Sequence, residues 1–205
     1  WGVYHGIRAA VAHRLGRHDL AGIVVSVQGL GHVGEHLLKF LHEAGAELVV
    51  ADIEPEQVSQ AVARYGATPV TAREIYDIEA DVFAPCALGA VLNDETIPRL
   101  KVSVIAGSAN NQLAEDRHGE ILAERRILYA PDYVINAGGI ININYEGPNY
   151  DARAALNHAA RIHDTLSDLF DAAEHRRAPT NMVADQMAET RIQAAKDRKR
   201  AGDYK

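Results

Sequence analysis

The chain has 205 residues, 47% of them hydrophobic, and a formal net charge of −7. This length is enough for one or two domains with a buried core, and the negative charge argues against a protein that binds nucleic acid or an anionic membrane surface. A single cysteine, Cys86, rules out an internal disulfide and a cysteine metal cluster. No apolar run reaches the roughly 18 residues of a membrane span, and no secretory signal is evident, so we expect a soluble cytoplasmic protein.

The predicted elements alternate along the chain. Residues 1–16 form a helix that is already under way at the first position, without an initiator methionine, so we expect that further residues precede it. Apolar runs then predict strands at 22–27, 47–51, 80–84 and 102–106, and more weakly at 127–129 and 133–135. Helical periodicity fills 33–44, 55–65 and 113–124, and one long amphipathic helix is predicted over 151–174. The alternation indicates a Rossmann-like, doubly wound α/β fold, with a mostly parallel sheet, helices on both faces and long helices at both ends.

A glycine motif follows the first strand directly. Gly29, Gly31 and Gly34 form G-x-G-x-x-G at the start of a helix. The first glycine permits a tight turn, the second lets a pyrophosphate approach the backbone, and the third allows the helix to pack closely on the strand. Asp52 ends the next strand, where a carboxylate would bind the adenosine ribose hydroxyls and repel a 2′-phosphate. Because no arginine follows in ADIEPEQV, we expect NAD rather than NADP as the cofactor.

Three later segments rich in small residues and amides follow predicted strands. They are APCALGAVLND from Ala84, AGSANNQL from Ala106 and INAGGIININ from Ile135. Ligands of open α/β sheets bind beyond the carboxyl ends of the strands, so these segments are candidates for the nicotinamide side of the site. Each alone could be an ordinary turn rich in glycine and asparagine.

Taken together, GLGHVG, PCALGAVLND, GSANNQL and APDYVINAGGIIN resemble the C-terminal, nucleotide-binding domain of the Glu/Leu/Phe/Val dehydrogenases, most closely the leucine and phenylalanine branch. The resemblance implies reversible, NAD-dependent oxidative deamination of a branched-chain or aromatic L-amino acid to a 2-oxo acid and ammonia. It also implies that Asn110 and Ile140 contact the substrate. The cofactor residues that it implies are Gly29, Leu30, Gly31, His32, Val33, Gly34, Asp52, Ile53, Cys86, Ala87, Ser108, Ala109 and Asn110.

The catalytic lysines and aspartate of that family lie in an N-terminal domain, and nothing in this sequence matches them. We therefore expect no catalytic residue in these 205 residues and no turnover by this segment alone. The resemblance divides the chain into an NAD-binding domain at 1–150, led by a connecting helix at 1–16, and helices at 151–205 that return toward the substrate domain. It also implies a homo-oligomer for the full-length protein.

Other features of the sequence admit different interpretations. His32 and His36 have a zinc-compatible spacing, but no third ligand is evident, so we expect no metal site. His158 and His163 fit a solvated helix surface. A catalytic Cys86 would need a base and an electropositive setting, and a small residue under the nicotinamide is the preferred interpretation. The alternative function is a non-catalytic module that senses NAD(H), which would leave the Asn110 and Gly138–Gly139 turns without a role.

Overall fold

A computed structural model describes residues 1–147 and 150–200, and its centre is a six-stranded sheet. The strand order is β3-β2-β1-β4-β5-β6, and every pair of neighbouring strands is parallel. The chain therefore crosses back over the sheet between β3 and β4, and the carboxyl ends of β1 and β4 lie side by side. The strands are β1 Val24–Gln28, β2 Glu47–Ala51, β3 Thr68–Pro69, β4 Val82–Pro85, β5 Val104–Ile105 and β6 Leu128–Tyr129.

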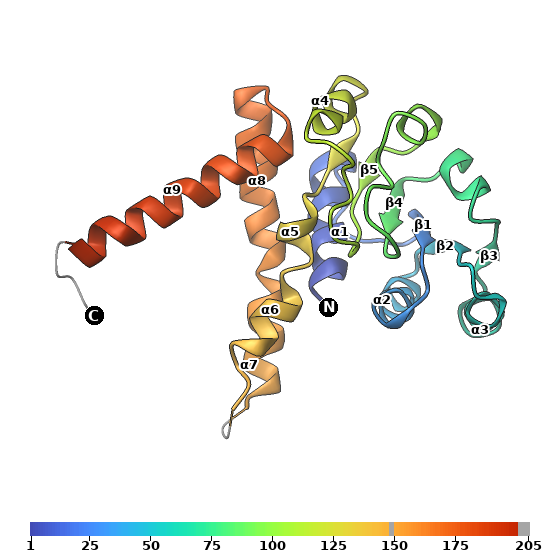
Figure 1. The fold of residues 1–205 in the computed structure, drawn as a ribbon. Helices are drawn as coiled ribbons and strands as arrows, with labels where there is room; N and C mark the ends of the chain where they lie inside the picture. Colours follow the sequence, from blue (N-terminus) through green and yellow to red (C-terminus); the bar gives the residue numbers. More distant parts are fainter. Residues whose placement is uncertain (148–149, 201–205) are drawn as a thin grey trace.

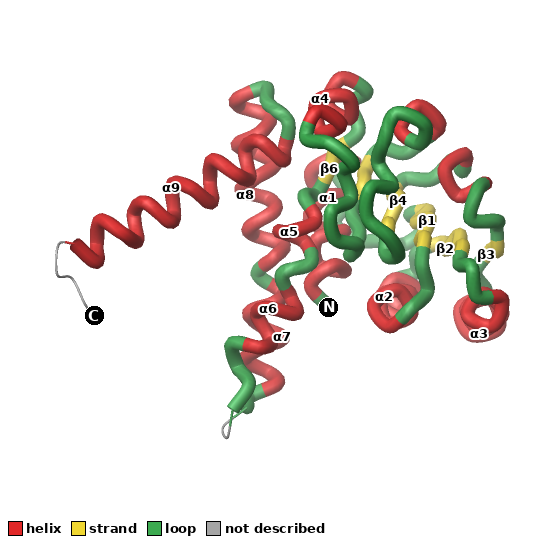
Figure 2. The backbone as a smooth tube through the Cα atoms, viewed as in Figure 1, coloured by secondary structure: helices red, strands yellow, loops and turns green. Residues whose placement is uncertain are grey.

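Helices flank the sheet, and the last one projects away from the body of the protein (Figures 1 and 2). The α-helices are α1 Gly2–Leu15, α2 His32–Glu43, α3 Pro55–Tyr65, α4 Arg117–Glu124, α5 Asp132–Ile135, α6 Gly138–Ile143, α7 Ala152–Ala160, α8 Ile162–Arg176 and α9 Thr180–Arg200. Two short 3₁₀ helices, η1 Glu74–Asp77 and η2 Ile97–Arg99, lie between β3 and β5.

Both faces of the central part of the sheet are buried, because neighbouring residues of β2, β4 and β5 enter different cores. Val82 and Ala84 belong to the larger core, which includes α1, α2 and α8, whereas Phe83 belongs to a second core with η1, η2 and α4. Strands covered on both faces read as nearly continuous apolar runs, which is why these runs were visible in the sequence. The structure thus confirms an α/β protein with a parallel sheet flanked by helices.

The predicted and observed elements differ in several places, of which four bear on the fold or the site. The strand expected at 133–135 is wrong: these residues lie in α5. A three-residue apolar run does not distinguish a strand from a buried helical turn. The helix expected over 113–124 begins only at Arg117. The two-residue strand β3 was not predicted, and the helix expected over 151–174 is two helices that meet at Arg161, where no glycine or proline marks the break.

The C-terminal helices expected over 151–205 are present as α7, α8 and α9 as far as residue 200, and residues 201–205 lie outside the described part of the chain. Among the described residues, none of these helices, nor any other, is both long and apolar enough to span a membrane.

Candidate functional site

The turn between β1 and α2 has three glycines with three different surroundings. Gly29 has φ +97°, a conformation that side chains disfavour, and a Cβ there would collide with Ala87. A Cβ on Gly34 would collide with the carbonyl oxygen of Gly29, so this glycine lets α2 sit directly against the turn. Gly31 is the residue that precedes the first turn of α2, and a Cβ there would meet no atom within 4 Å. Of the three glycines in this turn, Gly31 alone therefore opens onto free space.

That open side coincides with the N-terminus of α2. The first N–H groups of a helix have no partner within the helix, and the helix dipole adds a partial positive charge there. The first intrahelical bond runs from Glu35 N–H to Gly31 O, at 2.9 Å. The turn therefore offers donors and room for an anion on one side, which is the geometry that a bound pyrophosphate needs.

Asp52 connects the end of β2 to this turn. Its Oδ2 accepts a hydrogen bond from Leu30 N–H at 2.5 Å, and its Oδ1 accepts one from Glu54 N–H at 2.9 Å. Both carboxylate oxygens keep lone pairs for a further donor. The next residue, Ile53, is 84% exposed although it is apolar, so it presents an uncovered hydrophobic surface beside the carboxylate.

The loops after β4 and β5 pack against the glycine turn and against each other. Cys86 N–H donates to Gln28 O at 2.7 Å, and Ala109 N–H donates to Pro85 O at 2.9 Å. Gly107 has no room for a side chain, because a Cβ there would collide with Pro85. The structure therefore brings the predicted residues of these loops to one edge of the sheet, next to Gly29–Gly34.

A cavity of about 730 Å³ opens at this edge. Its lining includes residues predicted to bind the cofactor or the substrate: Val33, Ser108, Asn110 and Ile140. Further lining residues that were not among the predicted site residues come from α1, α5, α6, α7 and the residues around them. They include Trp1, Asn136, Ile143, Tyr150 and Leu156. The phenol of Tyr150 is the only titratable side chain in the lining that the structure describes.

Asn136 is the most informative of the residues that sequence reasoning missed. Its Nδ2 donates to Asn110 Oδ1 at 2.6 Å and lies 3.5 Å from Ser108 O. No local pattern links positions 26 residues apart, although Asn136 stands in the INAGG segment that the sequence did single out. Ile140, in α6, is 75% exposed and faces the cavity.

Cys86 does not have the surroundings of a reactive thiol. Burial raises the pKa of its thiol above the usual range, and hydrogen bonding with Ser108 only partly opposes this effect. A raised pKa keeps the sulfur protonated near neutral pH, and only the thiolate is a nucleophile. The structure thus supports Cys86 as a packing residue at the end of β4.

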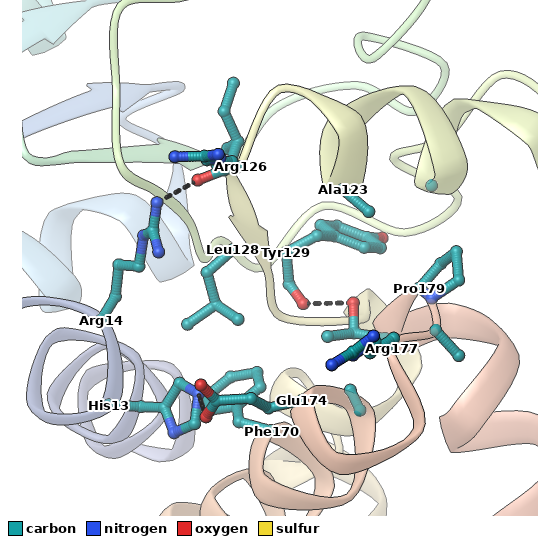
Figure 3. A pocket seen from close by; sticks show the side chains of 15 residues that line it. His13, Arg14, Ala123, Arg126, Leu128, Tyr129, Phe170, Glu174, Arg177 and Pro179 are labelled. Atoms are coloured by element: carbon teal, nitrogen blue, oxygen red, sulfur yellow. Dashed lines mark hydrogen bonds and ion pairs between the residues drawn. The ribbon is translucent and has the colours of Figure 1, made fainter.

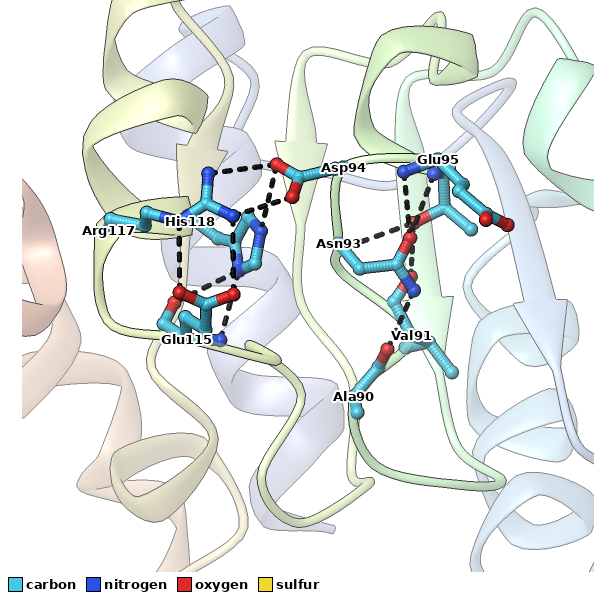
Figure 4. Close-up of polar contacts among 9 residues, drawn as sticks. Ala90, Val91, Asn93, Asp94, Glu95, Glu115, Arg117 and His118 are labelled. Carbon is cyan, nitrogen blue, oxygen red and sulfur yellow. Dashed lines mark hydrogen bonds and ion pairs between the residues drawn. The ribbon is translucent and has the colours of Figure 1, made fainter.

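In the described part of the chain, one group of three potential metal ligands comes together: Asp94, Glu115 and His118 (Figure 4). The guanidinium of Arg117 already lies between the two acids, with contacts of 2.5 and 2.9 Å to Asp94 and of 3.0 and 3.2 Å to Glu115. These bonds hold the pKa of both carboxyls below the usual range. An arginine therefore occupies the place of a cation, and the cluster fastens α4 to the loop after β4. Within the described residues, His32 and His36 belong to no such group.

A second cavity, of about 410 Å³, lies beside β6 between the C-terminal ends of α1, α4 and α8 (Figure 3). It shares no lining residue with the first cavity. Arg14 Nη2 donates to Arg126 O at 2.6 Å, and Arg177 stands at the end of α8. Cationic side chains are favoured at helix C-termini, so helix capping accounts for these arginines without a ligand.

Fold and site together define an α/β protein with an anion-compatible helix N-terminus and a ligand-sized cavity at the carboxyl edge of a parallel sheet. Residues 53–198 match the family Glutamate/Leucine/Phenylalanine/Valine dehydrogenase, and the chain belongs to this family. This membership confirms the resemblance at the level of the family.

Individual relatives agree with this assignment. The chain is 50% identical to a leucine dehydrogenase of Bacillus cereus over 197 residues, which cover 96% of this chain and 54% of that protein. It is 44% identical to a phenylalanine dehydrogenase of Caldalkalibacillus thermarum over 200 residues, which cover 94% and 54%. The crystal structure of L-tryptophan dehydrogenase from Nostoc punctiforme superposes with a TM-score of 0.92 at 46% identity, over 96% of this chain and 59% of that one. The chain spans about half the length of the curated relatives that it matches.

Proposed function

We propose that this chain is the NAD-binding part of an amino-acid dehydrogenase and that its fold is of the Rossmann type. The strand order 3-2-1-4-5-6 is the one known for dinucleotide-binding sheets, and it places a crevice where the order reverses, between β1 and β4. The proposal depends most on one observation: Gly31 opens onto free space at the N-terminus of α2, while its neighbours Gly29 and Gly34 are tightly enclosed. A cradle of this shape fits a pyrophosphate.

The rest of the cofactor would lie along the carboxyl edge on both sides of this cradle. On one side, Asp52 would accept hydrogen bonds from the adenosine ribose, and Ile53 would cover part of the adenine. On the other side, Ala87, Ser108 and Asn110 would border the nicotinamide. The charge of Asp52 would repel a 2′-phosphate, so the proposed cofactor is NAD rather than NADP. When bound, the nicotinamide ring would accept a hydride from the substrate.

We also propose a substrate class. The similar proteins are named leucine, phenylalanine and L-tryptophan dehydrogenases, so the substrate of the whole protein would be a branched-chain or aromatic L-amino acid. Its oxidative deamination gives a 2-oxo acid and ammonia. In this chain the Asn110 amide would orient the substrate amine, and Ile140 would pack against the substrate side chain. Apolar neighbours such as Ile143 and Leu156 would exclude water from this wall of the cavity.

This chain would supply only part of the active site. Removing a proton from the amine needs a base with a pKa near the working pH, and binding the substrate carboxylate needs a cation. The described lining of the cavity holds neither a lysine nor an arginine. We propose that these groups come from another part of the protein, that residues 1–150 bind the nucleotide, that 151–205 return toward that part, and that the whole protein is a homo-oligomer.

The test is the formation of NADH, followed by absorbance at alkaline pH, with L-leucine, L-valine, L-phenylalanine and L-tryptophan. The 205-residue chain should bind NADH in a calorimetric titration but show no turnover, because loss of the proton-transfer group alone costs a factor of about 10² to 10⁴. The full-length protein should turn over at least one of the four amino acids. Robust turnover by the chain alone would mean that it contains an overlooked base. NADH binding without turnover by the full-length protein would favour a sensing module instead.

A further inference from the structure

The turn at Asn110–Asn111 is held by a short helix that the proposed chemistry does not use. α5 and the residue after it contribute two side chains to this turn, Asp132 and Asn136, which are joined by the bond from Asn136 N–H to Asp132 O at 2.9 Å. Asp132 contacts the backbone of the turn, and Asn136 contacts its side chain. The two residues therefore act on the same turn from one short segment of the chain.

Asp132 is a buried carboxylate, 8% exposed, with both oxygens engaged. Its Oδ2 accepts from Asn111 N–H at 2.9 Å, and its Oδ1 accepts from the Tyr129 hydroxyl at 2.9 Å. Burial raises the pKa of the Tyr129 hydroxyl, and the charge of Asp132 adds to this effect, so the phenol stays a donor. A buried carboxylate is costly unless it is hydrogen-bonded, and here its bonds fix the position of one backbone N–H.

The backbone that Asp132 holds would not keep this shape easily by itself. Asn111 has φ +52°, in the left-handed region that is uncommon for residues other than glycine. The loop after β4 closes on its other side, where Ala90 N–H donates to Asn111 O at 2.6 Å and a Cβ on Gly89 would collide with Asn110 O. On the buried side of the turn, Gln112 Nε2 donates to Gly107 O and to Ala109 O, at 2.9 Å each. The turn is thus enclosed, and Asp132 supplies its link to α5.

Asn136 fixes the side chain that this turn presents. Its bond to Asn110 Oδ1 sets the plane of the Asn110 amide, which lines the cavity. An exposed asparagine without such a partner would rotate freely, and ordering it on binding would cost free energy. Because the bond from Asn136 already orders the Asn110 amide, ligand binding does not have to supply this free energy.

We propose that Asp132 and Asn136 are positioning residues that hold the Asn110 turn in the shape that receives the nicotinamide end of the cofactor. The inference rests on the proposed function, because it assumes that this turn meets the nicotinamide. It goes beyond that function by assigning a role to two residues to which the proposed cofactor and substrate contacts assign none. The proposal requires that changing either residue weakens binding of the nicotinamide half of the cofactor and leaves binding of the adenosine half unchanged.

The test compares two ligands by calorimetric titration: NADH, and ADP-ribose, which lacks the nicotinamide ring. Asn136→Ala and Asp132→Asn should weaken NADH binding about tenfold, the size expected for loss of one hydrogen bond. ADP-ribose should bind both variants within about twofold of the unmodified chain, which is within measurement error. Asn157→Ala, on the exposed face of α7, is the matched control and should bind both ligands normally. Equal weakening for both ligands, or unchanged NADH binding, would overturn the proposal.

A measurement without any ligand separates this proposal from the proposed function. In hydrogen–deuterium exchange, residues 107–112 should exchange about tenfold faster in Asp132→Asn, while β1 keeps its protection. If exchange in 107–112 does not change, the positioning role is wrong whatever the cofactor. If exchange in 107–112 accelerates but the unmodified chain binds neither ligand, the proposed cofactor is wrong. The proposed role of these residues at the nicotinamide is then wrong as well. Asn136 is only half-buried, so its alanine variant tests the idea even if Asp132→Asn folds poorly.

Discussion

Two regions of the sheet contribute to its carboxyl edge in different ways. In residues 24–34, the site depends on a few consecutive residues, those of the turn in which Gly31 faces free space and Gly34 faces the backbone of Gly29. In residues 82–143, the edge is assembled from separate loops. There Asn110 is held by a residue 26 positions away and Asn111 by one 21 positions away.

The difference decides what a sequence can reveal about each region. In the first region the spacing of glycines already specifies the turn, because the helix N-terminus and the strand end are joined by it. In the second, the spacing says only that small residues and amides follow the strands. Which amide faces the cavity, and what holds it, depends on how β4, β5 and α5 pack together.

The largest effect should come from filling the open side of the first region. Gly31→Val places a branched side chain where the pyrophosphate would lie, and we expect NADH binding to weaken on the order of 100-fold or more, like the loss of several charge-assisted hydrogen bonds. No atom lies within 4 Å of the new Cβ, so unfolding free energy should fall by no more than about 1 kcal/mol. Calorimetry and urea denaturation measure the two effects. Normal NADH binding by this variant would place the phosphate cradle elsewhere.

The same kind of substitution in the second region should damage the fold instead. Gly107→Ala forces a Cβ against the backbone and ring of Pro85, both of which are rigid, so we expect a loss of roughly 1–3 kcal/mol in unfolding free energy. Gly139→Ala is the control: its Cβ meets no atom within 4 Å and alanine favours a helix, so stability should stay the same or rise. Urea denaturation compares them. Equal stability of the two variants would remove the claim that the β5 loop is tightly enclosed.

A third and smaller effect concerns the link from β2 to the first region. Asp52→Asn keeps an oxygen for Leu30 N–H but removes the negative charge beside the ribose. We expect the preference for NAD over NADP to fall about tenfold, the size of one lost charge interaction near a surface. The ratio of the two dissociation constants measures it. If the unmodified chain already binds NADP as tightly as NAD, the role assigned to Asp52 is wrong.

The smallest effect should appear in α1. Burial lowers the pKa of His5 from 6.5 to about 4, and its Nε2 is buried without a partner among the described residues. The unfolded chain therefore binds a proton that the folded chain rejects, so stability is lost as the pH falls from about 6.5 to about 4. The slope cannot exceed about 1.4 kcal/mol per pH unit for one proton, and partial exposure reduces it to roughly half of that.

Urea midpoints measured at pH 7, 6 and 5 give this slope for His5→Gln and for the unmodified chain. His5→Gln should have a shallower dependence on pH, whereas His175→Gln, which changes an exposed histidine of α8, should keep the original slope. An identical slope in all three proteins would show that His5 does not resist protonation.

Much of the fold can be predicted from the sequence, because the signals that define its helices and strands lie within a few consecutive residues. β2 and α3 were predicted at their observed bounds, because the apolar run of β2 and the helical period of α3 are each ended by a clear signal: Asp52 after the strand, and Pro55 and Gly66 around the helix. β3 was missed because two exposed residues, one of them Pro69, carry no apolar pattern. For the candidate site, the expected residues do gather at one edge, but Asn136 and Asp132 could not have been found, since their importance arises only from tertiary hydrogen bonds.

We propose that the loops after β1, β4 and β5 together form one continuous site for NAD. A titration of the isotopically labelled chain with NAD, followed by backbone-amide NMR shifts, tests it most directly. We expect the largest shifts at Gly31, Ala87 and Asn110, with little change around Arg126 and Arg177 in the second cavity. Shifts confined to that second cavity, or no shifts at saturating NAD, would contradict it.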